Sequence, residues 1–289
     1  MQLKPYLASA ITLLTEAAVP SPRMNAELLM MFTLSCDRAY LYAHPERELI
    51  RDERTRYEAA IAERARGVPA QYITGHQEFW GMDLIITPAV LIPRPETEHV
   101  IEAVLERAGR EGFLKAQDKS LLANLRIVDV GTGSGCIALA LAKELPQAEI
   151  HAIDISAAAL EIARANTAQH QLDSRIHFRE ADLLAGFEDN LFDFVVSNPP
   201  YVGEFEEDQV QLEVRKFEPR NAVFAGHTGT EVIARLIQQA HASLKPGGSL
   251  IMEISGTIAE EVKRLLTGWK NVEIRPDLQS IPRVAQAQK

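Results

Sequence analysis

An amide side chain, two prolines and a phenol follow one another directly after an apolar run, in the segment Ser197–Tyr201. The side-chain oxygen of Asn198 and the backbone carbonyl of Pro199 are acceptors that could take the two hydrogens of a planar NH2 group. Proline lacks an N–H and fixes φ, so the turn is stiff and its carbonyls stay free for a ligand. The ring of Tyr201 could stack on the flat face of the same group. The plain structural alternative is a rigid Pro-Pro turn capped by asparagine.

A second chemical signal is the glycine-rich stretch 131–135, GTGSG, which lies between an apolar run and a helical pattern. Glycines there permit a tight turn and a close approach of a ligand to the backbone, and the start of the helix offers free N–H groups. The spacing is G-x-G-x-G, one residue shorter than the G-x-G-x-x-G that seats a dinucleotide pyrophosphate. S-adenosyl-L-methionine (SAM) has no phosphate, so the shorter spacing favours SAM over a dinucleotide.

Two aspartates that follow later apolar runs could hold the remainder of SAM. Asp154 comes about 20 residues after the glycines, where a carboxylate can accept from both hydroxyls of a ribose. Asp182, after the next run, could accept from the adenine amino group. Asp154 could instead cap the helix that begins near Ser156, and Asp182 could belong to a surface turn.

Together these residues predict methyl transfer to a planar nitrogen. The lone pair of such a nitrogen is delocalised and must face the methyl group of SAM. Orientation and preorganised dipoles would therefore supply most of the catalysis, and no strong base is needed beside the turn. An amide and a nucleobase amino group both fit this description.

The elements that must position these residues alternate between strands and helices from residue 95 onward. Such alternation demands a mainly parallel sheet with helices on both faces, a doubly wound, Rossmann-like α/β fold. The residues singled out above would follow the carboxyl ends of strands, where ligands of such sheets bind. The seven predicted strands are 125–130, 149–154, 175–180, 192–197, 248–254 and an antiparallel edge at 271–275 and 282–288; the predicted helices are 96–110, 136–145, 157–170 and 230–244.

Two further parts precede this pattern. Residues 1–70 carry apolar residues at helical spacing and predict a small helical bundle domain. Within it, the stretch 51–66 interleaves arginines, Arg64 among them, with acidic residues, which indicates a solvated helix face. Residues 71–94 contain a glycine turn after Phe79 and Trp80 and predict a β-hairpin linker. The catalytic domain would then span residues 95–289.

The composition excludes several classes of partner. The chain has 289 residues and a formal net charge of −10, which argues against direct binding of nucleic acid because such binding depends on excess Lys and Arg. No apolar run approaches the roughly 20 residues of a membrane helix, and the start lacks a signal-peptide pattern, so we expect a cytoplasmic protein without membrane association. Cys36 and Cys136 are expected to be reduced thiols, the histidines lack metal-ligand spacing, and we expect a monomer without a bound metal.

The glycine stretch, the acid at Asp154 and the Asn-Pro-Pro-Tyr turn together resemble class I SAM-dependent methyltransferases that act on planar amino groups. Three further segments narrow the resemblance: GVPAQYITGHQEFWGMDLIITPAVLIPRPETE at 67–98, FEPRNAVFAG at 217–226 and DLQSIPRV at 277–284. With them the chain is similar, over nearly its whole length, to the peptide chain release factor glutamine N5-methyltransferases, the PrmC or HemK family.

This resemblance implies a function and a set of site residues. Members of the family use SAM, which becomes S-adenosyl-L-homocysteine, to methylate the side-chain amide of the glutamine in the Gly-Gly-Gln motif of class 1 release factors. The resemblance places SAM at Gly131, Thr132, Gly133, Ser134 and Gly135, with Asp154 at the ribose and Asp182 and Leu183 beside the adenine. It places the substrate amide at Asn198, Pro199, Pro200 and Tyr201, and the expected catalytic residues are Asn198, Pro199 and Tyr201. Phe79, Arg94 and Thr97 would lie near the cofactor or the target, although Phe79 could equally serve hairpin packing.

Two other functions compete with this one. A nucleic-acid methyltransferase would meet the same planar nitrogen on adenine, cytosine or guanine, but it would need basic surface to grip the flanking phosphates. Residues 1–90 carry 9 Lys plus Arg against 11 Asp plus Glu, and the remainder 21 against 29, so neither part is basic. A non-catalytic SAM- or nucleotide-binding module would have no use for an amide-orienting turn. We therefore expect a protein glutamine as substrate, with the N-terminal helices recognising the body of the release factor.

Overall fold

The computed structural model describes residues 2–110, 125–187 and 191–289, and the chain divides into two compact units. One unit comprises Met1–His76 together with Gln211–Phe217, and the other comprises Gln77–Val210 together with Glu218–Lys289. The chain therefore passes from the second unit into the first and back again within the stretch that follows the Asn-Pro-Pro-Tyr turn. The assignment of the linker to 71–94 and of the flanking domains stays a prediction.

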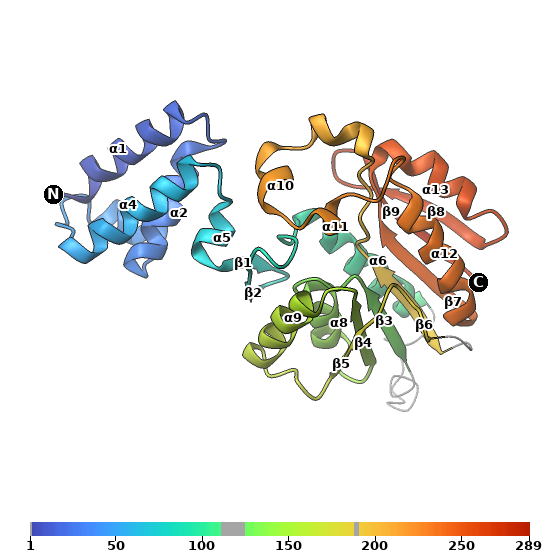
Figure 1. Cartoon of the computed structure of the whole chain (residues 1–289). Coiled ribbons are helices and arrows are strands. Elements are labelled where there is room, and N and C mark those ends of the chain that lie inside the picture. The colour runs from blue at the N-terminus through green and yellow to red at the C-terminus, as the bar shows by residue number, and fades with distance from the viewer. Residues whose placement is uncertain (1, 111–124, 188–190) are drawn as a thin grey trace. The chain divides into compact units, whose positions relative to one another are not determined.

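The first unit is helical, as its apolar periodicity predicted. Its helices are α1 (Leu3–Glu16), α2 (Pro22–Leu34), α3 (Arg38–Ala43), α4 (Arg51–Ala65), α5 (Ala70–Thr74) and, from much later in the chain, α10 (Leu212–Phe217) (Figure 1). The α2 helix starts at Pro22, whose fixed φ suits the first turn, and Asp37 caps α3 by accepting the Tyr40 N–H at 2.7 Å. Leu14, Leu29 and Met30 are fully buried and form the centre of its apolar core.

The prediction of a solvated face along 51–66 was wrong for Arg64, which is 4% exposed. Its guanidinium donates to Asn25 Oδ1 at 2.7 Å, to the Val68 carbonyl at 3.1 Å and to Glu213 Oε2 at 2.8 Å. A buried guanidinium needs such a complete set of acceptors because desolvation of the charge is costly. The ion pair with Glu213 thereby ties α10 to the helices of the first unit.

The second unit contains a seven-stranded sheet in the order β5-β4-β3-β6-β7-β9-β8, which confirms the predicted fold class. The first five strands in that order pair in parallel, and β9 is antiparallel to both β7 and β8. The strands are β3 (Arg126–Val130), β4 (Glu149–Asp154), β5 (Ile176–Glu180), β6 (Phe192–Ser197), β7 (Leu244–Glu253), β8 (Lys270–Pro276) and β9 (Pro282–Gln288). A separate two-stranded hairpin joins β1 (His76–Phe79) and β2 (Met82–Ile85) through Trp80 and Gly81, both at positive φ.

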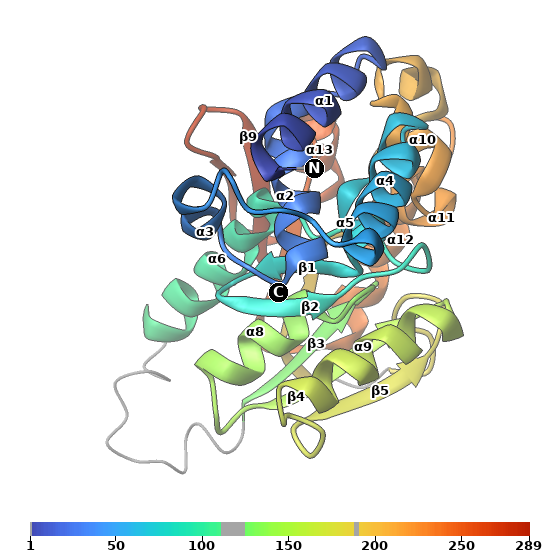
Figure 2. The same ribbon diagram turned by 90° about the vertical axis from the view of Figure 1, so that its left-hand side faces the viewer.

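Helices cover both faces of the sheet. The helical segments of the second unit are η1 (Pro95–Thr97), α6 (Glu98–Arg110), α8 (Cys136–Glu144), α9 (Ala157–Gln169), η2 (Glu204–Gln209), α11 (Arg220–Val223), α12 (Glu231–Ser243), η3 (Gly256–Ile258) and α13 (Ala259–Leu265). On one face α12 and α13 bury Leu236, Ile237 and Val262 against Val128 and Leu250 of the strands. Figure 2 looks onto the opposite face, which α8 and α9 cover.

The predicted boundaries shift at two places. The strand expected at 248–254 begins at Leu244, because Leu244 pairs with Phe192 across an irregularity in the β6–β7 ladder, and the preceding helix accordingly ends at Ser243. The helix expected from residue 96 begins as a short 3₁₀ turn and becomes α-helical only at Glu98. Both cysteines are free and partly buried. Among the described residues, no helix combines the length and the apolar character needed to cross a membrane.

A candidate active site at the carboxyl ends of the strands

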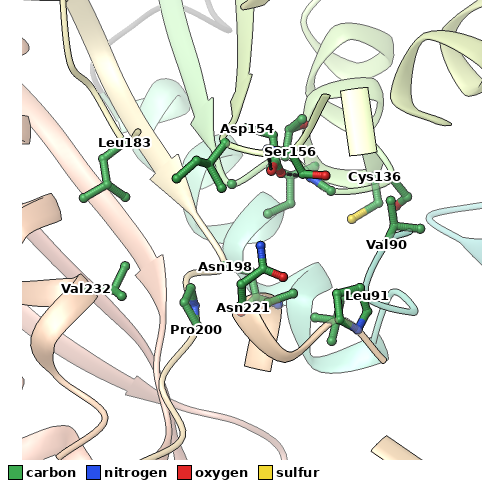
Figure 3. A pocket seen from close by; sticks show the side chains of 18 of the residues that line it. Val90, Leu91, Cys136, Asp154, Ser156, Leu183, Asn198, Pro200, Asn221 and Val232 are labelled. Carbon is green, nitrogen blue, oxygen red and sulfur yellow. Dashed lines mark hydrogen bonds between the residues drawn. The ribbon is translucent and has the colours of Figure 1, made fainter. Parts of the chain in front are cut away.

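A cavity of about 320 Å³ opens in the second unit where β3, β4, β5 and β6 end. This volume falls at the lower end of the range of small-molecule sites, and the position is the crevice where open α/β sheets bind ligands. The predicted site residues that line it are Thr97, Gly131, Thr132, Gly133, Ser134, Asp154, Asp182, Leu183, Asn198 and Pro200. The other predicted residues, Phe79, Arg94, Gly135, Pro199 and Tyr201, do not line it. Figure 3 shows Asp154 and Ser156 across the pocket from Asn198, Pro200 and Asn221.

The turn after β3 needs its glycines for different reasons. Gly131, Gly133 and Gly135 all have positive φ, which is strained for residues with a side chain. A Cβ on Gly133 would meet no atom within 4 Å, whereas a Cβ on Gly135 would lie 2.7 Å from Leu139 Cδ1 and 3.2 Å from Ala163 Cβ. Gly133 therefore faces the open cavity, and Gly135 allows α8 to pack closely on α9.

The Asp154 carboxylate accepts hydrogen bonds from two backbone N–H groups, one in the glycine turn and one at the start of α9. Its Oδ2 accepts the Gly133 N–H at 2.9 Å and its Oδ1 accepts the Ser156 N–H at 2.9 Å. Burial raises its pKa, and these backbone hydrogen bonds oppose that rise. The helix cap is Ser156, whose Oγ accepts the Ala159 N–H at 3.2 Å, so Asp154 is not the N-cap that was its alternative role. Each carboxylate oxygen keeps a lone pair for a further donor.

Asp182 and Leu183 form the third edge of the cavity. Asp182 Oδ2 is 2.5 Å from Arg235 Nη2, and both residues line the pocket. Leu183 has φ of 52°, an unusual conformation for a leucine. The Leu184 N–H donates to Gln239 Oε1 at 2.8 Å, which fixes the backbone there from α12. Strain at a leucine that borders a cavity is typical of ligand sites.

Asp129, which the sequence prediction missed, supports the glycine turn from below. It is fully buried as the next-to-last residue of β3, and its Oδ2 accepts from Thr132 Oγ1 at 2.6 Å and from the Ala138 N–H at 3.2 Å. Burial raises its pKa to about 7. The available signal was an acidic residue between valines in a predicted strand, two positions before the first glycine of the turn.

Asn166 joins the same turn to the hairpin. Its Nδ2 donates to the Ser134 carbonyl at 2.9 Å and to the Ile85 carbonyl at 3.1 Å, while its Oδ1 accepts the Ile85 N–H at 2.6 Å. The residue is fully buried in α9. One amide side chain thus completes the hydrogen bonds of the glycine turn and of the end of β2, which are far apart in sequence, a role that local sequence patterns do not reveal.

The Asn198 side of the cavity rests on a chain of side-chain hydrogen bonds. Asn198 Nδ2 donates to Thr97 Oγ1 at 3.0 Å, and Thr97 Oγ1 donates to Glu253 Oε2 at 2.6 Å. The Tyr201 hydroxyl donates to the other oxygen of Glu253 at 3.0 Å. Sequence reasoning missed Glu253, although an acid at the end of a predicted strand was the signal that singled out Asp154.

Phe79 and Arg94 do not take part in this series of hydrogen bonds. Phe79 is buried in the hairpin. The Arg94 guanidinium pairs with Glu218, whose other oxygen accepts the Ile92 N–H at 3.1 Å. Arg94 therefore fastens the IPRPETE segment to the FEPRNAVF segment and does not reach the cavity.

Comparison with known proteins agrees with this geometry. Residues 6–75 match the PrmC N-terminal domain family, and residues 109–215 match the methyltransferase small domain family. The release factor glutamine methyltransferase of Koribacter versatilis is 53% identical over 290 residues, which cover 100% of this chain and 99% of that protein. The protein of the same name from Chlorobaculum tepidum is 42% identical over 282 residues, which cover 96% of this chain and 94% of the relative.

A solved structure shows the same fold at lower identity. The hMettl16 catalytic domain, in complex with a MAT2A 3′UTR hairpin, matches with a TM-score of 0.54 at 18% identity, covering 82% of this chain and 80% of that one. This likeness concerns the fold alone. The full-length identity to the curated relatives decides the family, and the chain belongs to the release factor glutamine methyltransferases.

Proposed function

We propose that this protein transfers a methyl group from SAM to the side-chain amide nitrogen of the glutamine in the Gly-Gly-Gln motif of class 1 release factors. The observation that carries the proposal is one cavity that contains both the glycine turn and Asn198. A cofactor bound at the turn and an amide bound at Asn198 would share that cavity.

The residues at the glycine turn fit SAM. Asp154 retains acceptor capacity for ribose hydroxyls after binding Gly133 and Ser156. The open space beside Gly133 lets a ligand approach the backbone, and Leu183 offers an apolar surface to an adenine next to the carboxylate of Asp182. SAM would supply an electrophilic sulfonium methyl group and leave as S-adenosyl-L-homocysteine, the methylated nitrogen would lose one of its two hydrogens as a proton to water, and the protein would supply orientation.

The substrate side derives its chemistry from acceptors rather than from a base. Asn198 Oδ1 and the Pro199 carbonyl would accept the two hydrogens of the glutamine amide, which holds its plane and turns the nitrogen toward the methyl group. The preorganised acceptors favour the partial positive charge that develops on that nitrogen during transfer. Tyr201, whose hydroxyl is bound to Glu253, would stiffen the turn from behind.

The helical first unit is proposed to recognise the body of the release factor. The protein is further proposed to be a cytoplasmic monomer that does not bind nucleic acid directly. Support comes from its match to the PrmC N-terminal domain family and from the net charge of −10.

Incubation of the full chain with methyl-labelled SAM tests the proposal. Three acceptors are compared: a class 1 release factor, the same factor with its motif glutamine replaced by glutamate, and DNA or RNA. We expect label on the unaltered factor alone. Label on nucleic acid, or equal label on both forms of the factor, would contradict the proposed substrate.

A further inference from the structure

A carboxylate lies buried directly behind the asparagine of the site. Glu253 is the last residue of β7, is 1% exposed, and follows Met252, which pairs with Ser197 immediately before Asn198. Within the described residues, no cation forms an ion pair with it. Its hydrogen-bond partners are the hydroxyls of Thr97 and Tyr201, at 2.6 and 3.0 Å.

Such an arrangement is not one that stability alone favours. Burying a carboxylate without a cation is costly, and an apolar side chain at the end of a core strand would avoid that cost. Burial correspondingly raises the pKa of Glu253, and the two hydroxyl donors and the more distant Arg283 oppose the rise. Because stability does not account for a buried carboxylate here, the role of the two hydrogen bonds that Glu253 accepts must lie in function.

When Glu253 is ionised, the donors and acceptors allow one arrangement only. A carboxylate accepts and cannot donate, so the hydroxyl hydrogens of Thr97 and Tyr201 both point at Glu253. A threonine hydroxyl has one hydrogen, and once it is given to Glu253 the oxygen can only accept. Asn198 must then present its NH2 group to Thr97, as the 3.0 Å contact from Nδ2 has it.

The consequence is a fixed orientation of the Asn198 amide. The oxygen and nitrogen of an asparagine have nearly the same shape, so packing alone does not choose between the two orientations. With the NH2 group held by Thr97, Oδ1 is left as the group for a ligand. A reversed amide would present N–H groups to the N–H groups of a substrate amide and would repel it.

We propose that Glu253 is a positioning residue that acts through Thr97 to hold the oxygen of Asn198 toward the substrate nitrogen, and through the Tyr201 hydroxyl to hold the turn. This inference rests on the proposed function, because it assumes that the ligand at Asn198 is a hydrogen-bond donor. It assigns a role to two residues: Thr97 acts through Asn198, and Glu253 acts through Thr97 and through the Tyr201 hydroxyl.

Glu253→Gln and Thr97→Val test the proposal on the full chain. In Glu253→Gln the new NH2 group can donate to Thr97, which frees the Thr97 hydroxyl to donate to Asn198 and lets the amide reverse. We expect kcat on a release factor to fall about 100-fold in each variant, the scale of losing one preorganised hydrogen bond, with SAM affinity unchanged. Thr97→Ser keeps the hydroxyl and should restore most of the rate.

A double variant and a matched control sharpen the test. Because the residues act in series, Thr97→Val combined with Glu253→Gln should be no slower than either alone. Ser249→Ala lies on the same strand and removes a buried hydroxyl that has no hydrogen-bond partner among the described residues, so it should leave kcat unchanged. Full activity in Glu253→Gln, multiplied losses in the double variant, or Thr97→Ser as slow as Thr97→Val would overturn the proposal.

A readout that needs no substrate separates this inference from the function. In the wild-type chain with SAM bound, the side-chain NH2 of Asn198 should exchange its hydrogens slowly by NMR, and Thr97→Val should abolish that protection. Fast exchange in the wild type would overturn the orientation. Protection together with a wild-type enzyme that does not label release factors would instead contradict the proposed function.

Discussion

The two sides of the cavity are constructed differently. The glycine side, formed by Gly131–Ser134 and Asp154, is held mainly by hydrogen bonds that the Asp154 carboxylate accepts from backbone N–H groups 21 and 2 residues away. The amide side, formed by Thr97, Asn198 and Glu253, is held by side chains that lie 101 and 156 residues apart. Substitutions on the glycine side should therefore mainly lower the affinity for SAM. Substitutions on the amide side should mainly lower kcat and leave the affinity for SAM unchanged.

The largest effect is expected on the amide side. Asn198→Ala removes the side-chain acceptor, and we expect kcat to fall by about 100- to 1000-fold, as when one group of a preorganised site is lost. The dissociation constant for SAM should change little, because Asn198 makes no hydrogen bond to the glycine side. Single-turnover rates and calorimetric titration of SAM measure the two quantities. If Asn198→Ala lowered kcat and the affinity for SAM to a similar extent, the two sides of the cavity would not have the separate roles proposed for them.

Asp154→Ala should act in the opposite way. It removes the acceptor of the Gly133 and Ser156 N–H groups and the proposed ribose partner, so we expect the dissociation constant for SAM to rise about 10-fold or more. The rate at saturating SAM should fall far less. Titration followed by assay at high SAM checks both, and an unchanged affinity would mean that the ribose lies elsewhere.

The glycine side itself contains a second contrast. Gly135→Ala forces a Cβ against Leu139 and Ala163 at φ of 84°, so we expect the free energy of unfolding to drop by about 1–3 kcal/mol. Gly133→Ala meets open space, so strain of about 1–2 kcal/mol is its only structural cost, and its main effect should be on SAM affinity. Urea unfolding and SAM titration of both variants distinguish packing from binding. The reverse assignment would refute the roles given to the two glycines.

The smallest effect concerns pH. Burial raises the pKa of Asp129 from its ordinary value of 3.8 to about 7 in the folded chain. The folded state thus binds a proton that the unfolded state releases between these values, so Asp129 contributes stability at acid pH that is lost as pH rises toward 7. Asp129→Asn, which can keep an acceptor for Thr132, should flatten the decline of the melting temperature between about pH 4 and pH 7. An unchanged slope would place the titration in another group.

The contrast between the sides also explains what sequence could predict. The sheet, the glycine turn and Asp154 follow from local signals: β-branched runs, helix starts, and an acid at the end of a strand. The start of β7 was predicted four residues too late because Pro246 and the glycines after it resemble a turn. Only the pairing of Leu244 with Phe192 in β6 extends the strand to that residue.

The missed residues share one physical property. Glu253, which was not predicted, meets Thr97 and Asn198 only after folding brings the ends of β6 and β7 to the 3₁₀ turn Pro95–Thr97, and no local pattern predicts that contact. Arg64 was assigned to a solvated face because its neighbours in sequence are charged, but its acceptor Glu213 lies 149 residues away. A buried charge is thus recognisable from its tertiary partners, and in Glu253 those partners are the hydroxyls that orient the site.

The most direct measurement of the central claim is the position of the methyl group. A class 1 release factor is incubated with SAM and either the wild-type chain or Asn198→Ala, and its peptides are sequenced by tandem mass spectrometry. The account predicts one methyl group on the side chain of the motif glutamine with the wild-type protein and almost none with the variant. A methyl group on another residue, or equal methylation by the variant, would contradict it.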